Sequence, residues 1–465
     1  MEGAGHLQDL ANCKALRILS EKIKNVKQFS SEACIFKVQE QLRKTKPEAY
    51  TPSTISIGPY HHGKAELRKM ERWKELYTQS FLNRTQGGVG VEECWRKLKD
   101  LQGRAERYYG DLDDIKFVDD DDEFVKMLLL DGCFIVEYVI IQSGVGMLQK
   151  CIVDPIFMIQ GMDTNIARDM LLLENQLPFF VLQALYDMIC NLPVKPEFWK
   201  MVKFAFEPCL PKKTIISLPV YPGQEIKHLL QLVHILCQPQ PQNNAGQIHQ
   251  QQKACSSCCS WKQPQQSRDD LEVELCSIRT ASELQEAGVH FKKLGKISDN
   301  SNKTISLFDI KFEGGVLEIP SFALYDSTET FFRNLIAYEQ HSPYVHPKYF
   351  TDYAMFMDDL INTEKDVNLL RLKDVFINGL GDDKEVTLLF NNLTKEVTHD
   401  INGFYYKNVC TELNRHCKKP WNAAMAKLRR NYFHSPWAGI STFAAILLLS
   451  LAIAQTVLSA LGLHK

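Results

Sequence analysis

The sequence lacks an excess of charge of either sign, because 54 lysine and arginine residues balance 56 aspartate and glutamate residues. The resulting net charge of −2 leaves the chain without the positive field that drives non-specific binding to nucleic acid. The hydrophobic share of 45% and the charged share of 24% are typical of globular proteins and exclude a collagen-like, coiled-coil or wholly disordered chain. We therefore expect a globular protein with no nucleic-acid partner.

Common signatures of catalysis are also missing. The 465 residues contain no P-loop, no G-x-S-x-G elbow, no H-E-x-x-H motif, no Rossmann glycine run and no kinase motif. Because an enzyme can lack all of these, the sequence leaves catalysis open without supporting it. We assign no catalytic, cofactor-binding or metal-binding residue and expect no cofactor.

The N-terminal residues lack the apolar core of about 7–15 residues that a secretory signal requires. Many of the 14 cysteines lie inside apolar runs, as Cys133 and Cys190 do, where a free thiol behaves as a small buried hydrophobe. Both features favour a reducing compartment such as the cytosol.

One long hydrophobic run is present, near the C-terminal end. Residues 437–463 contain no charged side chain and include twelve leucine, isoleucine, valine and phenylalanine residues. A helix needs about 20 residues to cross about 30 Å of hydrocarbon, and each of these residue types favours insertion by about 0.3–0.6 kcal/mol. We predict a single transmembrane helix at 437–463, the alternative being a buried core helix.

The residues before this run indicate its orientation. The preceding segment is basic and includes Lys418, Lys419, Lys427, Arg429 and Arg430. Only one histidine and one lysine follow the run, so the positive-inside rule places the bulk of the chain in the cytoplasm, and we favour the plasma membrane. The five basic residues are also expected to attract anionic lipid headgroups, although they could simply form a solvated helix face.

For the rest of the chain we predict a predominantly α-helical body over residues 34–430, α+β in class because it contains a small β-hairpin. The hairpin is predicted where alternating apolar residues flank Gly314 and Gly315. An amphipathic helix is expected within an N-terminal region, residues 1–33, over residues 10–28. Apolar periodicity and proline boundaries predict further helices over 66–82, 161–177, 178–189, 198–206, 225–236 and much of 328–413, with a structured loop over 50–63.

Two segments of the body need separate interpretation. Residues 124–141 are nearly long enough to cross a membrane but contain Lys126, Asp131 and Glu137, each of which would cost about 2.5–3.5 kcal/mol near the bilayer centre. We therefore predict a soluble core helix there. Residues 238–270 contain ten glutamines among 33 residues and few large aliphatic side chains, which predicts a flexible insertion.

Several motifs resemble a plant-specific family, the domain of unknown function 247. They run in order along nearly the whole chain: ISIGPYHHG, ELRKMERWKELY, LLLDGCFIVEY, ARDMLLLENQLPFFVLQAL, ASELQEAGVHFKK, DIKFEGGVLEIP, DSTETFFRNLIAYEQ and YFHSPWAGISTFAAILLL. The resemblance implies a plant protein with a helical body, one C-terminal membrane span and no established catalytic residue; some members are implicated in grass self-incompatibility. One departure is Gln39, where members usually carry proline, so the chain is expected to bend differently there.

Polar residues within apolar runs are the candidate site residues that remain. Glu174, Asn175 and Gln176 lie in LLLENQLPFF, and Glu339 and Gln340 lie in IAYEQ. Buried groups of this kind need hydrogen-bond partners, which favours a structural network. Two carboxylates about 5–9.5 Å apart in such surroundings would instead suit a hydrolase.

Histidine and cysteine pairs give weaker indications of a site. His61–His62 and the pair His341 and His346 are expected to pack or form hydrogen bonds in loops. The cysteines Cys255, Cys258, Cys259 and Cys276, with His249, supply only one well-spaced pair, which is weak evidence for zinc.

The function that these features favour is a tail-anchored interaction or signalling module with an unknown protein partner. The first alternative is a membrane-tethered hydrolase that uses Glu174 or Glu339. The second is the same body displayed outside the cell as a recognition ligand, as in self-incompatibility.

Overall fold

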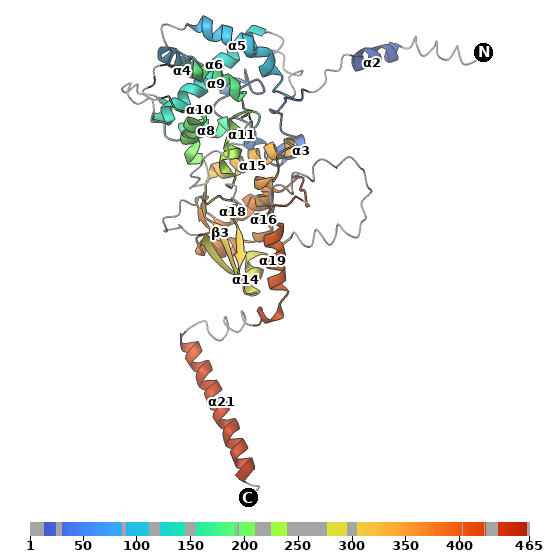
Figure 1. Cartoon of the computed structure of the whole chain (residues 1–465), viewed down its shortest axis with the longest axis vertical. Helices are drawn as coiled ribbons and strands as arrows, with labels where there is room; N and C mark the ends of the chain where they lie inside the picture. The colour runs from blue at the N-terminus through green and yellow to red at the C-terminus, as the bar shows by residue number, and fades with distance from the viewer. Residues whose placement is uncertain are drawn as a thin grey trace, which may run out of the picture.

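The computed structural model describes residues 14–24, 30–85, 90–110, 121–144, 155–190, 192, 195–209, 225–239, 277–294, 305–401, 403–422, 424 and 436–462. Figure 1 shows a largely helical body, with helix α2 (Lys14–Lys24) and helix α21 (Pro436–Gly462) standing apart from it at the two ends of the chain. The described part of the chain thus confirms a mostly helical protein with small sheets.

The first half of the body is a helical bundle built around α6 (Asp121–Gln142). The helices that pack on α6 are α4 (Glu71–Arg84), α5 (Val91–Glu106), α9 (Phe179–Asp187) and α10 (Phe198–Phe206). Apolar side chains of α6 such as Phe124, Phe134 and Tyr138 are fully buried. The prediction of a core helix over 124–141 is therefore confirmed.

Two ion pairs with α4 explain how α6 tolerates acidic side chains in this core. Lys74 Nζ lies 2.7 Å from Asp131 Oδ1, and Arg84 Nε lies 2.8 Å from Glu137 Oε2. Both carboxylates are buried, so each charge is neutralised where water cannot solvate it. Lys126 lies at the exposed end of α6 and pairs with Glu123 at 3.0 Å.

Helix α15 (Asp326–His341) joins the two halves of the body. It contacts η1 (Pro47–Ala49), α8 (Met162–Met170) and α11 (Leu229–Cys237) of the first half, and α16 (Tyr349–Leu360) and α18 (Asp383–Leu393) of the second. The second half also contains α14 (Ala281–Glu286), α17 (Glu364–Leu372) and α19 (Lys407–Cys417). Shorter elements of the first half are α3 (Glu40–Thr45), η2 (Ala65–Met70), α7 (Pro155–Met158) and η5 (Glu207–Cys209).

The predicted hairpin is confirmed. Strands β2 (Lys311–Glu313) and β3 (Val316–Pro320) pair antiparallel, and the intervening Gly314 and Gly315 have φ of +59° and +83°, which glycine adopts without steric cost. The sequence did not indicate three further strands. Strand β1 (His290–Leu294) adds to β3 in parallel, and β4 (Phe322–Leu324) pairs in parallel with β5 (Phe376–Asn378).

Most predicted helices lie close to their expected positions, but the helix expected over 161–177 is wrong in its second half. Helix α8 ends at Met170, and residues 171–178 form turns. The physical reason is that the side chains of Asn175 and Gln176 donate hydrogen bonds to backbone carbonyls of 169, 170 and 172, which supplies an alternative to helical bonding.

The different bend expected at Gln39 is also not found. Gln39 precedes α3 with φ −51° and ψ +136°, which is close to the conformation that proline itself takes. Glutamine therefore occupies the backbone geometry that the family proline would impose.

The chain ends were predicted to contain an amphipathic helix and a membrane span. Helix α2 occupies the described part of the first segment, and α21 covers most of the second. Counted over the described residues alone, no helix combines the length with the apolar character that crossing a bilayer requires. The glutamine-rich segment 238–270 lies outside the described residues except for its first two positions.

Candidate functional site

The loop 50–63 is held against the first half of the body by a polar turn, residues 169–176. One carboxylate oxygen of Asp169 accepts hydrogen bonds from the backbone amides of Ser53, Thr54 and Ile55, at 3.0, 2.6 and 3.0 Å. Asn175 donates to the carbonyl of Ile55 at 3.0 Å. The side chains of the polar turn therefore supply the backbone partners that a loop without regular structure needs.

Glu174 connects the polar turn to a different part of the first half. Its carboxylate accepts a hydrogen bond from the amide of Val38 at 2.5 Å, forms an ion pair with Arg43 and lies 3.2 Å from His61 Nε2. Burial by itself would raise the pKa of Glu174, but the contacts with His61, Arg43 and Val38 outweigh it and lower that pKa. A general acid needs the opposite shift, so this geometry favours a structural role for Glu174.

Glu339 lies near the end of α15, and its carboxylate contacts the start of α16. Its carboxylate accepts hydrogen bonds from the amides of Phe350 and Thr351 at 3.0 and 2.8 Å and from the Thr351 hydroxyl at 2.7 Å. His234 Nε2 lies 2.8 Å from the same carboxylate. A buried negative charge at a helix N-terminus is favourable, and here it joins α11, α15 and α16.

The two glutamate motifs do not converge on a common reaction centre. The residues that bind Glu174 are distinct from those that bind Glu339, and neither glutamate lines either of the two cavities described below. Gln176 donates to carbonyls of its own turn, and Gln340 donates to the carbonyl of Thr398 at 3.0 Å. These contacts are those of a structural hydrogen-bond network.

The two histidines of each predicted pair have different surroundings in the structure. His61 contacts Glu174, and burial lowers the pKa of its imidazole, whereas His62 is only partly buried. His341 is the last residue of α15, contrary to the expected loop position, and its Nδ1 lies 2.7 Å from the carbonyl of Ala337. His346 Nε2 lies 2.9 Å from the carbonyl of Pro343 in a loop.

No cluster of three or more metal-binding side chains occurs among the described residues. The segment with Cys255, Cys258, Cys259, Cys276 and His249 lies outside them.

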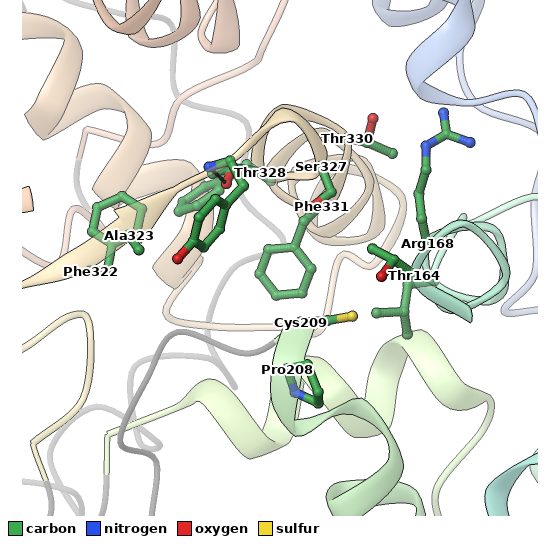
Figure 2. A pocket seen from close by; sticks show the side chains of 13 residues that line it. Thr164, Arg168, Pro208, Cys209, Phe322, Ala323, Ser327, Thr328, Thr330 and Phe331 are labelled. Atoms are coloured by element: carbon green, nitrogen blue, oxygen red, sulfur yellow. Dashed lines mark hydrogen bonds between the residues drawn. The ribbon is translucent and has the colours of Figure 1, made fainter. Parts of the chain in front are cut away.

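A cleft lies where the two halves of the body meet. We call it the inter-half cleft; it is lined by Thr164, Arg168, Leu171, Pro208, Cys209, Phe322, Ala323, Tyr325, Ser327, Thr328, Thr330, Phe331 and Phe332. Figure 2 shows the Phe331 ring inside it with Pro208 and Cys209 on the opposite wall, and the Arg168 guanidinium turned away from Phe331. The cavity volume is about 70 Å³, well below the range of about 300–1,000 Å³ that small-molecule sites occupy.

The polar groups of this cleft are poorly suited to catalysis. Burial raises the pKa of Cys209 to about 11, so its thiol is protonated at neutral pH and is a weak nucleophile. The Arg168 guanidinium lies 2.6 Å from Asp169 Oδ1 and donates to the carbonyl of Glu48 at 2.6 Å. The Arg168 guanidinium therefore already binds structural partners, one of which is Asp169 of the polar turn.

Exposed apolar side chains lie on elements next to this cleft. Met158 ends α7, just before α8, and Phe204 lies in α10, just before η5. Both are exposed, as are Ile159 and Tyr325. We call these four residues the apolar rim. Of these four, Tyr325 lines the cleft itself, and the other three lie on elements that adjoin its lining residues in the chain. Exposed apolar surface is one feature of protein-binding sites. Sequence reasoning missed the apolar rim because its members are separated by up to about 170 positions, with no common motif.

A second groove, of about 560 Å³, lies between α17 and α18. Arg371 and Asp383 form an ion pair across it at 3.0 Å, and the Asp382 side chain accepts a hydrogen bond from the amide of Lys384 at the start of α18. Three of the charged residues that line this groove, Arg371, Asp382 and Asp383, therefore already bind one another or the backbone.

Comparison with known proteins places the chain in a plant family. The family described as "Plant protein of unknown function", domain of unknown function 247, matches residues 35–451. The UPF0481 protein At3g47200 of Arabidopsis thaliana is 30% identical, over 92% of this chain and 86% of the relative. A putative UPF0481 protein of the same plant, At3g02645, is 25% identical, over 90% of this chain and 89% of the relative. No solved structure matches. The chain therefore belongs to the plant family of domain of unknown function 247.

Proposed function

We propose that the protein is a tail-anchored, single-pass membrane protein whose helical body acts as an interaction module. Its bulk faces the cytoplasm, at the plasma membrane in our preferred assignment. It performs no catalytic reaction of its own in this proposal, and its partner is another protein.

The observation that carries the proposal is the exposure of α21. Its described side chains are exposed along the helix, including large apolar ones on different sides such as Phe443, Leu448 and Leu449. Figure 1 shows the helix apart from the described part of the body. A helix that is apolar all round needs an apolar environment, and a bilayer supplies one. The uncharged run 437–463 extends beyond the described residues of α21.

The segment before α21 supports the orientation and the lipid contact. Lys418 and Lys419 are exposed at the end of α19, and Trp421 next to them is exposed as well. Lysine and tryptophan side chains of this kind are favoured beside headgroups at a membrane interface. The other three basic residues, Lys427, Arg429 and Arg430, lie outside the described residues.

The inter-half cleft and the apolar rim are the proposed recognition surface. The cleft is too small for most metabolites but could admit one apolar side chain of a partner, while the four rim residues would add contact area around it. The buried carboxylates of the body bind structural partners, which supports an interaction module over a hydrolase.

Membrane extraction tests the anchor. In plant cells the full-length protein should remain in the membrane pellet after carbonate treatment. Replacing Leu447 and Leu451 by aspartate should release it, because each central charge costs about 3 kcal/mol on the insertion scale. Leu447→Ile with Leu451→Ile is the matched control and should remain in the pellet. Equal retention of the aspartate variant would refute the anchor.

A further inference from the structure

Helix α2 is exposed on all sides. Every side chain that the structure describes from position 15 to 24 is exposed, and the exposed fractions of Leu16, Leu19 and Ile23 are 40%, 53% and 65%. Figure 1 shows the helix apart from the body. The body therefore does not bury its apolar side chains.

The apolar residues of α2 define a face. Leu16, Leu19 and Ile23 are three and four positions apart, a spacing that aligns them along one side of a helix. Arg17, Lys22 and Lys24 lie on the other sides of the helix and outnumber its single acidic residue, Glu21. Ile18 is the exception, because it lies roughly opposite Leu16 and close to Lys22.

A helix of this length should not persist alone in water. It has 11 residues, and isolated helices shorter than about 12–15 residues are marginal even in alanine-rich sequences. The helical state of α2 would be stabilised by a surface that buries Leu16, Leu19 and Ile23 and carries negative charge beside the basic residues.

We propose that α2 lies on an anionic lipid bilayer. Leu16, Leu19 and Ile23 would enter the boundary between headgroups and acyl chains, and the three basic side chains would remain beside anionic headgroups. A flat bilayer suits a single narrow apolar stripe with no aromatic anchor. A protein groove could bind the same three apolar positions, but the excess of basic over acidic side chains on α2 favours an anionic lipid surface. This membrane contact is additional to the anchor at α21 and does not depend on it.

The test uses the full-length chain in which the two other proposed membrane contacts, the anchor at α21 and the basic segment before it, have been removed. Leu447→Asp with Leu451→Asp disables the proposed anchor, and glutamine replaces the five basic residues Lys418, Lys419, Lys427, Arg429 and Arg430. This protein should float with vesicles of phosphatidylcholine containing phosphatidylserine and bind vesicles of phosphatidylcholine alone at least tenfold more weakly. Absence of binding to the phosphatidylserine vesicles would overturn the proposal and leave a protein groove as the occupant of α2.

Three substitutions in α2 test the face itself. Leu19→Gln should weaken binding about tenfold or more, because it removes a buried leucine. Ile18→Gln is the matched control, on the opposite side of the same helix, and should change binding less than about twofold. Lys22→Gln should weaken binding to anionic vesicles about fivefold, since a basic residue near such a surface contributes about 1 kcal/mol. Equal losses from Ile18→Gln and Leu19→Gln would refute the assigned face.

Discussion

Among the individual residues, Asp352 has the most unusual electrostatic environment. It is buried in α16, accepts a hydrogen bond from the amide of Tyr405 at 2.9 Å and lies 3.8 Å from His399 Nε2. Burial raises the pKa of Asp352 to about 7; the Tyr405 hydrogen bond opposes this, and the charges of Glu339 and Asp400 add to it. The carboxyl group of Asp352 is therefore about half protonated at neutral pH.

This pKa predicts a specific pH dependence of stability. Because the folded state binds the proton more tightly than the unfolded state, the contribution of Asp352 is greatest below about pH 4 and falls as the pH rises to about 7. Between pH 5 and 7.5 the loss should be about 2 kcal/mol of unfolding free energy. Asp352→Asn, whose amide oxygen can still accept from Tyr405, should remove that component.

Urea unfolding at pH 5 and pH 7.5 measures this difference for both proteins. Burial lowers the pKa of His399, so its contribution changes in the opposite direction, but His399 is present in both proteins and largely cancels in the comparison. An identical pH dependence in the wild type and Asp352→Asn would contradict the assignment.

The sequence identified two of the buried carboxylates of the body but could not identify their partners. Glu174 and Glu339 stood out as acidic residues in apolar runs, which correctly predicted that they need hydrogen bonds. Their partners include Val38, 136 positions from Glu174, and His234, 105 positions from Glu339. Nothing in local spacing encodes such contacts, so the choice between a network and a paired-carboxylate site required the structure.

At the scale of elements, the pairing of α4 with α6 determines the first half of the body. Lys74 is fully buried and contacts Asp131 at 2.7 Å, Glu71 at 2.7 Å and the Ser56 hydroxyl at 3.2 Å. Asp131 in turn accepts a hydrogen bond from the amide of Gly58 at 2.8 Å. One buried ion pair thus connects α4, α6 and the loop 50–63.

Removing Lys74 should therefore be costly. Lys74→Met leaves Asp131 as an uncompensated buried charge, for which we expect a loss of about 3–5 kcal/mol in the free energy of unfolding. Lys126→Met is the matched control, because it makes the same substitution at the exposed Lys126–Glu123 pair and should cost less than about 1 kcal/mol. Denaturant unfolding measures both; similar losses would mean that the Lys74 contact is not important for stability.

Helices that depend on local pattern were predictable from the sequence, as α6 and α10 show. The elements that were missed depend on distant segments. Strands β4 and β5 have only three residues each, and more than 50 positions separate them. A three-residue strand leaves too little alternation to detect, and a parallel partner cannot be inferred from a neighbouring turn. The turns at 171–178 escaped prediction because the side chains of Asn175 and Gln176 compete with helical hydrogen bonds.

For the whole molecule, the proposal with the largest consequence is the cytoplasmic position of the body. The sequence contains three N-x-[ST] acceptor sites, at Asn83, Asn302 and Asn392. Asn83 is exposed on α4 and Asn392 is partly exposed on α18, so a glycan would have room at least at the first. Asn302 lies outside the described residues.

Glycosylation distinguishes the cytoplasmic assignment from the displayed ligand. Asparagine acquires a glycan only when the body enters the secretory lumen. The basic segment before the uncharged run favours retention of the body in the cytoplasm. We therefore expect glycosidase treatment to leave the electrophoretic mobility of the plant-expressed protein unchanged. Replacement of all three asparagines by glutamine should change its mass by the substitutions alone.

If each acceptor site instead carried a glycan, the proposed orientation of the body would be reversed. The inter-half cleft and the apolar rim would then face the cell exterior, and a displayed recognition ligand would become the leading function.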